Sequence, residues 1–533
     1  MFDYIIIGAG SAGCVLANRL TENPKIKVLL LEAGGPDKSM KISIPAAFSN
    51  LFKTEVDWAY ETVPQKPLNN RKLFVPRGKT LGGSSSINAM IYIRGFPQDY
   101  DEWGKENSGW KFEDVLPYFK KSESNQVFSN ELHGVDGPMW VSNQINPNKL
   151  TNIYLKAAQE CSYHITDDFN GNNPQGFGIF QCTQKNGKRH STARAFLLPA
   201  MKRPNLKVIT NALVTKIIIE NRANVSDTFE PARAKAIGVE FKLNGERKVE
   251  KAKHEVILSS GAINSPQLLM LSGIGDVEHL KEKGIKVVHH LPGVGQNLQD
   301  HAVIPVIYSC GKNITLDTIE TPLNFLKWLL FKKGPLTSIL AEAGGFVKTR
   351  PDLSAPDLQF HFGPAYFLDH GFVRPKGNGI SHGPILIKPK SRGEIKLSSN
   401  SQEDYPLIDQ NMLAEEEDRQ TLIKGFRIAD KILSAFAFDL YRTKNFMPER
   451  KLNSDEEISA YIRETCEYLY HPVGTCKMGS DEMAVVDHQL KVHGIEGLRV
   501  VDASIMPSIT RGNTNAPSIM IGEKGADLVK ENW

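Results

Sequence analysis

Cysteine is scarce in this chain of 533 residues: six are present, at positions 14, 161, 182, 310, 466 and 476. No two of them form a CxxC pair or a zinc-finger spacing, so the sequence predicts no metal site. Such sparse use in a long chain argues against a disulfide framework and favours reduced thiols, as in the cytoplasm.

Long apolar runs and an excess of one charge are also lacking. No stretch of 18 apolar residues occurs, which excludes a spanning helix. The first residues, MFDYIIIGAG, lack the basic segment of a signal peptide and are typical of a strand. Lys and Arg number 64 against 60 Asp and Glu, a net charge of +4 with the signs interspersed, so nucleic acid is not an expected partner. We therefore expect a soluble, cytoplasmic enzyme.

Glycine is concentrated in a few short runs, and the first of them begins a nucleotide-binding pattern. An apolar strand at 2–7 leads into Gly8, Gly10 and Gly13 in the order GxGxxG, followed by helical spacing and a second apolar strand that ends at Glu32. Gly8 allows the tight turn, Gly10 allows a pyrophosphate to approach the backbone, and Gly13 allows close helix–strand packing. Glu32 is suited to accept hydrogen bonds from ribose hydroxyls. The unit predicts dinucleotide binding but does not separate FAD from NAD.

A second glycine run lies at 76–95, PRGKTLGGSSSINAMIYIRG. Gly82, Gly83 and three serines place many N–H and O–H donors in a short loop, which suits contacts to phosphate or to the edge of a flavin. Pro76 and Arg77 precede the loop tightly and a strand follows it, which argues against a flexible linker.

The C-terminal part contains a histidine in a stiff context, YLYHPVGTCKMG at 468–479. Pro472 restricts His471 to an extended conformation, and Gly474 indicates a turn. A neutral imidazole is the side chain best suited to remove a hydroxyl proton near neutral pH. The chain has 13 other histidines, and most single histidines are surface or satisfied core residues.

Together these segments resemble the glucose–methanol–choline (GMC) flavin oxidoreductases. The resemblance is carried by GAGSAGCVLANRL, the 76–95 run, GAINSP followed by LSGIG, the HPVGTC segment and the 499–526 run, in family order over essentially the whole chain. It implies FAD as cofactor, and it places Ile87 where members with covalent flavin have a histidine, which implies non-covalent FAD. It also implies His471 as the catalytic base and Asn513 as the second catalytic residue, with Asn515 as the rival position. An amide cannot itself serve as base, so His471 is the only base of the pair.

The predicted site is therefore as follows. The catalytic residues are His471 and Asn513, and the cofactor-binding residues are Gly8, Gly10, Ser11, Ala12, Gly13, Glu32, Ala33, Arg77, Gly82, Gly83, Ser84, Asn88, Ala89, Val214, Asp502, Ala503, Asn513 and Thr514. Val214 enters because family members contact the adenine end of FAD through the corresponding backbone, and Asp502 is expected to be structural or cofactor-binding.

The expected fold class is α/β, with a Rossmann-type FAD-binding domain interleaved with an α+β substrate domain built on an antiparallel sheet. The predicted divisions are 1–310 for the FAD-binding domain with some substrate-domain insertions, 311–464 for the substrate domain, and 465–533 for the return to the FAD-binding domain.

In its detailed motifs the sequence resembles alkane-utilisation alcohol dehydrogenases most, and choline dehydrogenases next. This implies oxidation of a primary alcohol, with medium-chain aliphatic alcohols favoured, to the aldehyde, by hydride transfer to flavin N5 and electron transfer to quinone or oxygen. A choline dehydrogenase or an aryl or furan alcohol oxidase is the alternative, and a cyanohydrin lyase is a distant one. Choline would need an aromatic cage with a carboxylate; Phe360, Phe362, Tyr366 and Phe367 could supply rings, but no carboxylate can be assigned from sequence.

One further segment, 322–335 (PLNFLKWLLFKKGP), is strongly apolar and carries three lysines. We expect a helix that packs over the substrate pocket. The alternative is an amphipathic patch in a membrane interface, which would place the enzyme peripherally on the inner face of the cytoplasmic membrane.

Overall fold

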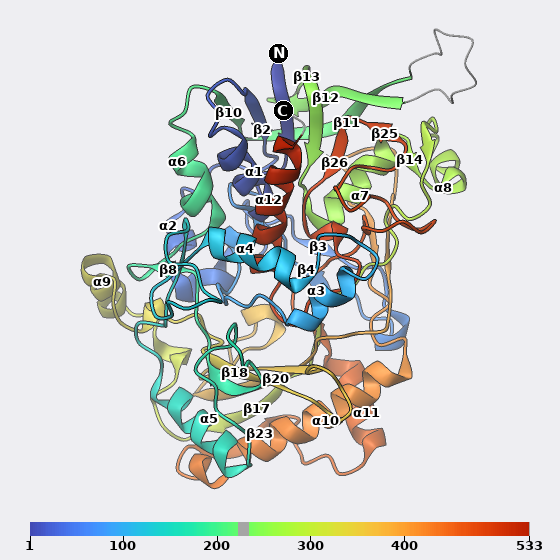
Figure 1. Cartoon of the computed structure of the whole chain (residues 1–533). Helices are drawn as coiled ribbons and strands as arrows, with labels where there is room; N and C mark the ends of the chain where they lie inside the picture. The colour runs from blue at the N-terminus through green and yellow to red at the C-terminus, as the bar shows by residue number, and fades with distance from the viewer. Residues whose placement is uncertain (222–233, 532–533) are drawn as a thin grey trace.

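The computed structural model describes residues 1–221 and 234–531 and contains two large sheets. Figure 1 shows one sheet in the upper half of the molecule and the other in the lower half. Both ends of the chain, blue and red in Figure 1, lie together in the upper half, while the middle of the chain forms most of the lower half. This is the predicted α/β class with an interleaved second domain.

The upper sheet begins with apolar strands that are buried on both faces, as is usual for parallel strands covered by helices. Its strands, in spatial order, are β10 (Leu206–Ile209), β2 (Val28–Leu31), β1 (Phe2–Ile7), β13 (Glu246–Leu258), β12 (Ala234–Leu243) and β11 (Ala212–Asn221), with β26 (Leu498–Val500) beside β13 and β25 (Ile495–Glu496) beside β12. The first four and β26 are parallel, whereas β13, β12 and β11 form an antiparallel extension. The parallel part aligns the carboxyl ends of β1 and β2, where the GxGxxG turn and Glu32 follow.

Helices from opposite ends of the chain pack on each other beside this sheet. The helix α1 (Ser11–Leu20) lies against α12 (Asn515–Lys530), as Figure 1 shows. A Cβ at Gly522 would come within 2.9 Å of the Ala12 Cα, so the helices approach at backbone distance. Arg19 adds an ion pair to the buried Glu523 at 2.7 Å. The start of α1 is thereby fixed against the C-terminal segment.

The lower sheet is antiparallel. Its strands, in spatial order, are β23 (Arg442–Met447), β17 (Val306–Cys310), β20 (Gly379–Leu386), β19 (Leu358–Gly363), β18 (Ala343–Val347) and β7 (Gly176–Ile179), with β16 (Ala302–Val303) and β24 (Glu467–Tyr468) attached. The helices α10 (Glu416–Leu433) and α5 (Lys149–Glu160) pack against it, and α11 (Asp455–Thr465) packs on α10. Strands from both sides of residue 310 contribute, and the division into 1–310, 311–464 and 465–533 stays a proposal.

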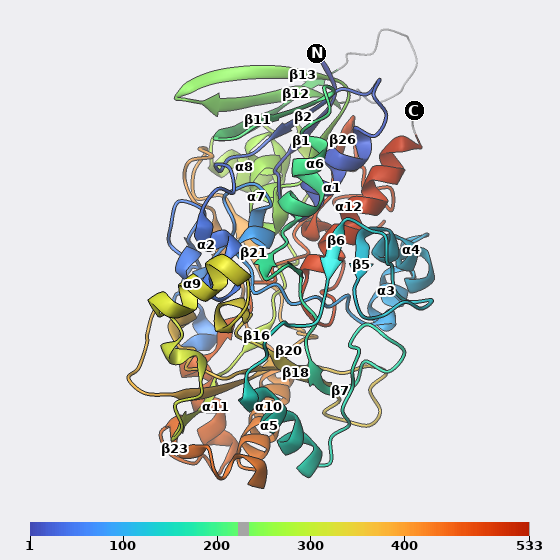
Figure 2. The ribbon, with the colours of Figure 1, turned by 90° about the vertical axis from the view of Figure 1, so that its left-hand side faces the viewer.

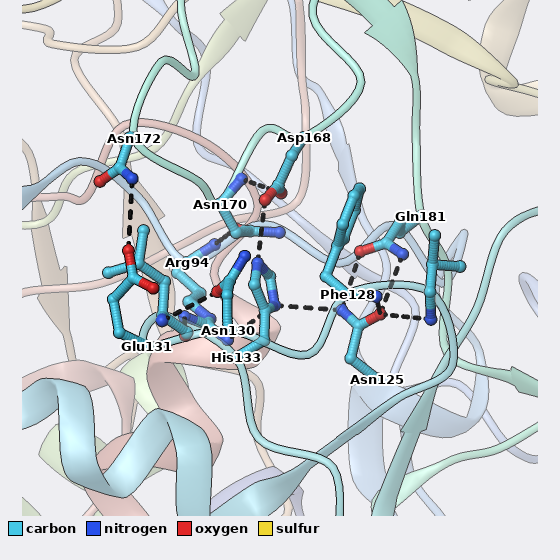
Figure 3. Close-up of polar contacts among 12 residues, drawn as sticks. Arg94, Asn125, Phe128, Asn130, Glu131, His133, Asp168, Asn170, Asn172 and Gln181 are labelled. Carbon is cyan, nitrogen blue, oxygen red and sulfur yellow. Dashed lines mark hydrogen bonds and ion pairs between the residues drawn. The ribbon is translucent and has the colours of Figure 1, made fainter.

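A buried polar cluster joins the end of the second glycine run to two distant loops, and Figure 3 shows the part of it around Arg94, His133 and Asp168. Arg94 forms an ion pair with Glu123, and its backbone N–H donates to the Asn170 side chain at 2.8 Å. His133 bridges Glu123 at 3.2 Å and Asp168 at 2.9 Å. Burial acts to lower the pKa of His133, but the hydrogen bonds to Asp168 and Glu123 outweigh it and raise that pKa. The cluster holds the chain that leaves the 76–95 run.

Candidate active site

The two glycine runs lie in direct contact with each other. Gly83 has φ +51°, and a Cβ there would lie 2.8 Å from the Gly10 Cα. Within the first run, a Cβ at Gly13 would lie 1.9 Å from the Gly8 carbonyl oxygen. Gly13 and Gly83 therefore cannot be replaced without moving backbone, which is the reason that these glycines are needed.

Glu32 is buried at the end of β2 and supports the first glycine turn. Its Oε2 accepts the Ala9 N–H at 2.8 Å, and its Oε1 accepts the Gly34 N–H at 2.8 Å. Burial raises the pKa of Glu32 to about 7, because it outweighs these two hydrogen bonds. The carboxylate also lines the cavity beside the turn, where remaining lone pairs can accept hydroxyl donors.

A narrow cavity of about 120 Å³ follows the glycine runs. The predicted cofactor residues that line it are Gly8, Gly10, Ser11, Ala12, Glu32, Ala33, Arg77, Gly83, Ser84, Val214, Asp502 and Ala503. It is also lined by Trp58, the 259–264 segment, Gln402 and Ser518, which the site prediction left out. The sequence could have pointed to the 259–264 segment as part of the site, because GAINSP belongs to the family pattern.

The other predicted cofactor residues lie elsewhere. Gly13 and Gly82 are not among the lining residues. Gly13 packs against the Gly8 backbone, whereas a Cβ at Gly82 would meet the Ser86 hydroxyl at 2.3 Å. Asn88, Ala89, Asn513 and Thr514 line a second cavity of about 550 Å³. The two cavities adjoin, since both are lined by Ser11, Arg77, Ser84, Ala503 and Ser518.

The predicted catalytic pair meets at the wall of the larger cavity. The Asn513 Nδ2 lies 3.1 Å from the His471 Nε2, and both residues line the cavity. Burial, followed by the nearby His301, His361 and Arg77, lowers the pKa of His471 well below its usual value. The imidazole is therefore neutral at neutral pH and available as a base.

Three buried residues that sequence reasoning missed surround this pair. The His301 Nδ1 lies 3.0 Å from the His471 Nδ1, and the Gln359 Nε2 lies 3.3 Å from the Asn513 Oδ1. The Asp300 Oδ1 accepts the backbone N–H groups of His471 at 2.8 Å and of His301 at 2.7 Å. Burial raises the pKa of Asp300 to about 7. The polar run NLQDH at 297–301 was the feature of the sequence that could have pointed to Asp300 and His301.

Asn515, the rival candidate for the second catalytic residue, has a different hydrogen-bond partner. It is the first residue of α12, and its Oδ1 accepts the Ser11 hydroxyl at 2.7 Å. Asp502 lines the narrow cavity and also supports the 259–264 segment, because its Oδ2 accepts the Gly261 N–H at 2.9 Å and the Ser265 hydroxyl at 2.6 Å. Ile87 is buried and lines the larger cavity.

The larger cavity is mainly apolar but has a polar region. Phe48, Phe52, Ile339 and Leu340 are among its apolar lining residues. In the polar region, Arg71 forms an ion pair with Glu467, whose second oxygen has no hydrogen-bond partner among the described residues. Burial raises the pKa of Glu467 to about 7, with Arg71 opposing the shift.

The segment 322–335 forms a helix, α9 (Pro322–Phe331), but it does not cover the cavity as expected. None of its residues lines the cavity, and it projects from the left-hand side of the molecule in Figure 1, the side that faces the viewer in Figure 2. Trp328 alone is buried, and its indole N–H donates to the Gly187 carbonyl at 2.8 Å. Leu323, Leu330 and Phe331 are exposed by 75%, 62% and 66%.

Within the described ranges, no helix combines the length and apolar character that crossing a bilayer requires.

Comparison with known proteins shows the family of this chain. The N-terminal sequence profile described as GMC oxidoreductase matches residues 2–303, and the C-terminal profile matches residues 389–522. The chain is 47% identical to "Alcohol dehydrogenase [acceptor]" of Pseudomonas putida, covering 99% of this chain and 96% of the relative. It is 43% identical to the mitochondrial choline dehydrogenase of Homo sapiens, covering 99% and 90%. Among solved structures, formate oxidase matches with a TM-score of 0.91 at 27% identity, covering 100% of this chain and 98% of that one. The chain belongs to the GMC oxidoreductase family.

Proposed function

We propose that this protein oxidises a primary alcohol to the aldehyde with bound FAD. The observation that carries the proposal is the neutral His471 paired with Asn513 at 3.1 Å, in the wall of an apolar cavity that adjoins the glycine-lined cavity. A base and an amide donor that converge on one point of a cavity suit a substrate hydroxyl.

The residues of the narrow cavity fit FAD. Glycine backbone at Gly10 and Gly83 and the N-terminus of α1 suit a pyrophosphate, and Glu32 suits the adenosine ribose. When bound, FAD supplies the acceptor for a hydride from the alcohol carbon. Ile87, at the family's attachment position, has no nucleophilic atom, which supports non-covalent binding.

The protein's own part in the reaction is positioning and proton transfer. A substrate hydroxyl that reaches both residues from the cavity would donate its proton to the His471 Nε2, and the Asn513 amide N–H would turn to hold the same oxygen. The apolar lining excludes water from that oxygen and strengthens both contacts.

The size and lining of the larger cavity favour a medium-chain aliphatic alcohol, and the alcohol dehydrogenase relative supports this class. Quinone or oxygen is the proposed acceptor. Choline is the second candidate, since Asp369, Glu467 and several aromatic rings line the same cavity. Arg71 pairs with Glu467, however, and leaves that carboxylate poorly suited to a cationic group.

We also infer that α9 touches a lipid surface, at the inner face of the cytoplasmic membrane. Its exposed face is apolar and the 322–335 segment contains no acid. Lys327 and Lys333 form no ion pair with any described carboxylate, and neither does Lys188, which follows the Gly187 that Trp328 contacts. Apolar exposure beside unneutralised lysines is the combination that anionic bilayers attract.

The experiment that tests the function is anaerobic reduction of the purified flavoprotein by a substrate panel. Alcohols from ethanol to dodecanol, benzyl alcohol, hydroxymethylfurfural and choline are mixed with the wild type and with His471→Ala, and flavin absorbance is followed. We expect an octanol-sized alcohol to bleach the wild type, and His471→Ala to keep its flavin but react about 10²- to 10⁴-fold more slowly. Equal rates would refute the role of His471, and bleaching by choline alone would refute the substrate class. Bleaching by any alcohol would exclude a pure lyase.

A further inference from the structure

His301 contacts His471 on the side opposite Asn513. The two Nδ1 atoms are 3.0 Å apart, and the rings meet edge to face with an interplanar angle of 84°. A neutral imidazole carries one N–H and one lone pair, so one of the two Nδ1 atoms must donate to the other. Which one donates decides whether the His471 Nε2 is a base or already carries a proton.

The amides of Gln359 and Asn513 favour one direction for this hydrogen bond. The Gln359 Nε2 donates to the Asn513 Oδ1 at 3.3 Å, which leaves the Asn513 amide nitrogen facing the His471 Nε2 at 3.1 Å. An amide nitrogen only donates, so the His471 Nε2 accepts and the His471 proton is on Nδ1. His471 must then donate to the His301 Nδ1.

The two rings are held in this arrangement by backbone and by burial. A single oxygen, the Asp300 Oδ1, accepts the backbone N–H groups of both histidines, which ties their main chains together. His301 is fully buried, and burial lowers its pKa to about 3. His301 therefore stays a neutral acceptor when His471 gains a proton.

We propose that His301 is a positioning residue that fixes His471 in the tautomer with Nδ1 protonated and the Nε2 lone pair directed at the substrate oxygen. The proposal rests on the proposed alcohol oxidation. In the proton-transfer step the substrate O–H bond breaks and an Nε2–H bond forms, while the Nδ1 proton remains donated to His301. Without His301, the proton could move to Nε2 and remove the base.

Two variants separate the effect of losing the acceptor atom of His301 from the effect of losing its ring. Asn and Leu have nearly the same branched shape, and the Asn Oδ1 takes the place of the histidine Nδ1. His301→Asn therefore keeps an acceptor for His471, whereas His301→Leu removes it and leaves a cavity of similar size. Flavin content and thermal unfolding of both variants show whether they fold.

The first measurement reads the tautomer directly. The holoenzyme is labelled with ¹⁵N-histidine, and the His471 signals are assigned by their loss in His471→Gln. We expect the wild type and His301→Asn to show a protonated Nδ1 and an unprotonated Nε2, and His301→Leu to show a mixture or the reverse. A protonated Nε2 in the neutral wild type, or an unchanged tautomer in His301→Leu, would overturn the proposal.

The second measurement is the rate of flavin reduction by the best alcohol. We expect His301→Leu to be slower by about tenfold or more and His301→Asn to stay within about threefold of the wild type, with the apparent substrate Kd changed less than about threefold in both. Equal slowing of the two variants would indicate a packing role and overturn the proposal. If no alcohol reduces the wild type, the proposed function fails while the tautomer measurement still decides the role of His301.

Discussion

The exposed face of α9 gives a quantitative prediction for membrane binding. The perturbation is the triple variant Leu323→Ser, Leu330→Ser and Phe331→Ser, at side chains that are exposed by 75%, 62% and 66%. None of them lines either cavity, and the anchoring Trp328 is left in place. The fold and the site should therefore be unaffected.

The magnitude follows from the apolar surface that a bilayer would cover. Complete burial of a Leu or Phe side chain is worth about 1.5–3 kcal/mol, so side chains that are about two-thirds exposed can each contribute about 1–2 kcal/mol. The three together contribute about 3–6 kcal/mol, which corresponds to about 10²- to 10⁴-fold in lipid affinity. Each lysine near an anionic surface adds about 1 kcal/mol.

The assay is co-sedimentation with phosphatidylglycerol-rich vesicles and with neutral phosphatidylcholine vesicles, at low and high salt. We expect the wild type to bind the anionic vesicles, more weakly at high salt, and the triple variant to stay in the supernatant. The matched control is Phe436→Ser with Leu440→Ser, which removes apolar side chains exposed by 77% and 78% from a surface beside α5. Equal binding of the wild type and the triple variant would refute the reasoning. Loss of a dimer instead of lipid binding, measured by light scattering, would identify a second copy as the partner of α9.

Two further predictions concern the cofactor cavity and the buried polar cluster. Gly83→Ala should lower FAD affinity at least about tenfold, because its Cβ would lie 2.8 Å from the Gly10 Cα and because Gly83 has φ +51°. The fluorescence of FAD released from the purified variant measures its flavin content. A full flavin content would contradict the prediction. His133 has a raised pKa in the folded state, so the stability from its contacts with Glu123 and Asp168 is fully present below about pH 6.5 and is lost as the pH rises through the folded value. The free energy of unfolding, measured with urea at several pH values, should fall with rising pH in the wild type, and this contribution should be absent in His133→Gln.

Local sequence was sufficient for the parts of the site that one continuous segment builds. The apolar run of β1, the glycines after it and the acid that ends β2 determine a βα turn by their own conformational limits, and Figure 1 shows the first helix in its expected place beside the sheet. The second glycine run was predicted from the N–H and O–H donors that it places in a short loop, but its contact with Gly10 required the fold.

The environment of His471 could not be predicted in the same way. His301 is 170 residues from His471 in the chain, and Gln359 is 154 residues from Asn513. His301 stands in the polar run at 297–301, but that run does not show which group its ring contacts, and Gln359 stands in no such pattern. Their roles follow from the pairing of strands in the antiparallel sheet, which is a long-range property.

In the helix α9, the sequence was sufficient to predict the helix but not which of its side chains are buried. Its sequence predicted a short apolar helix, and Thr321 caps it by accepting the Asn324 N–H at 3.2 Å, with Pro322 at the first position. Helix formation is local, but the direction of the apolar face depends on what packs against it. Only the tertiary structure decided that Trp328 is buried and that the neighbouring leucines are exposed.

The sequence by itself determined the glycine turn after β1 and the family pattern, because backbone conformation and residue chemistry are local properties. His471 as the base stays a proposal that the sequence suggested. The tertiary structure decided which groups face the His471 imidazole, how the two cavities adjoin and which surface is left apolar. These depend on contacts between segments that lie far apart in the chain, and burial and hydrogen-bond direction exist only once those contacts have formed.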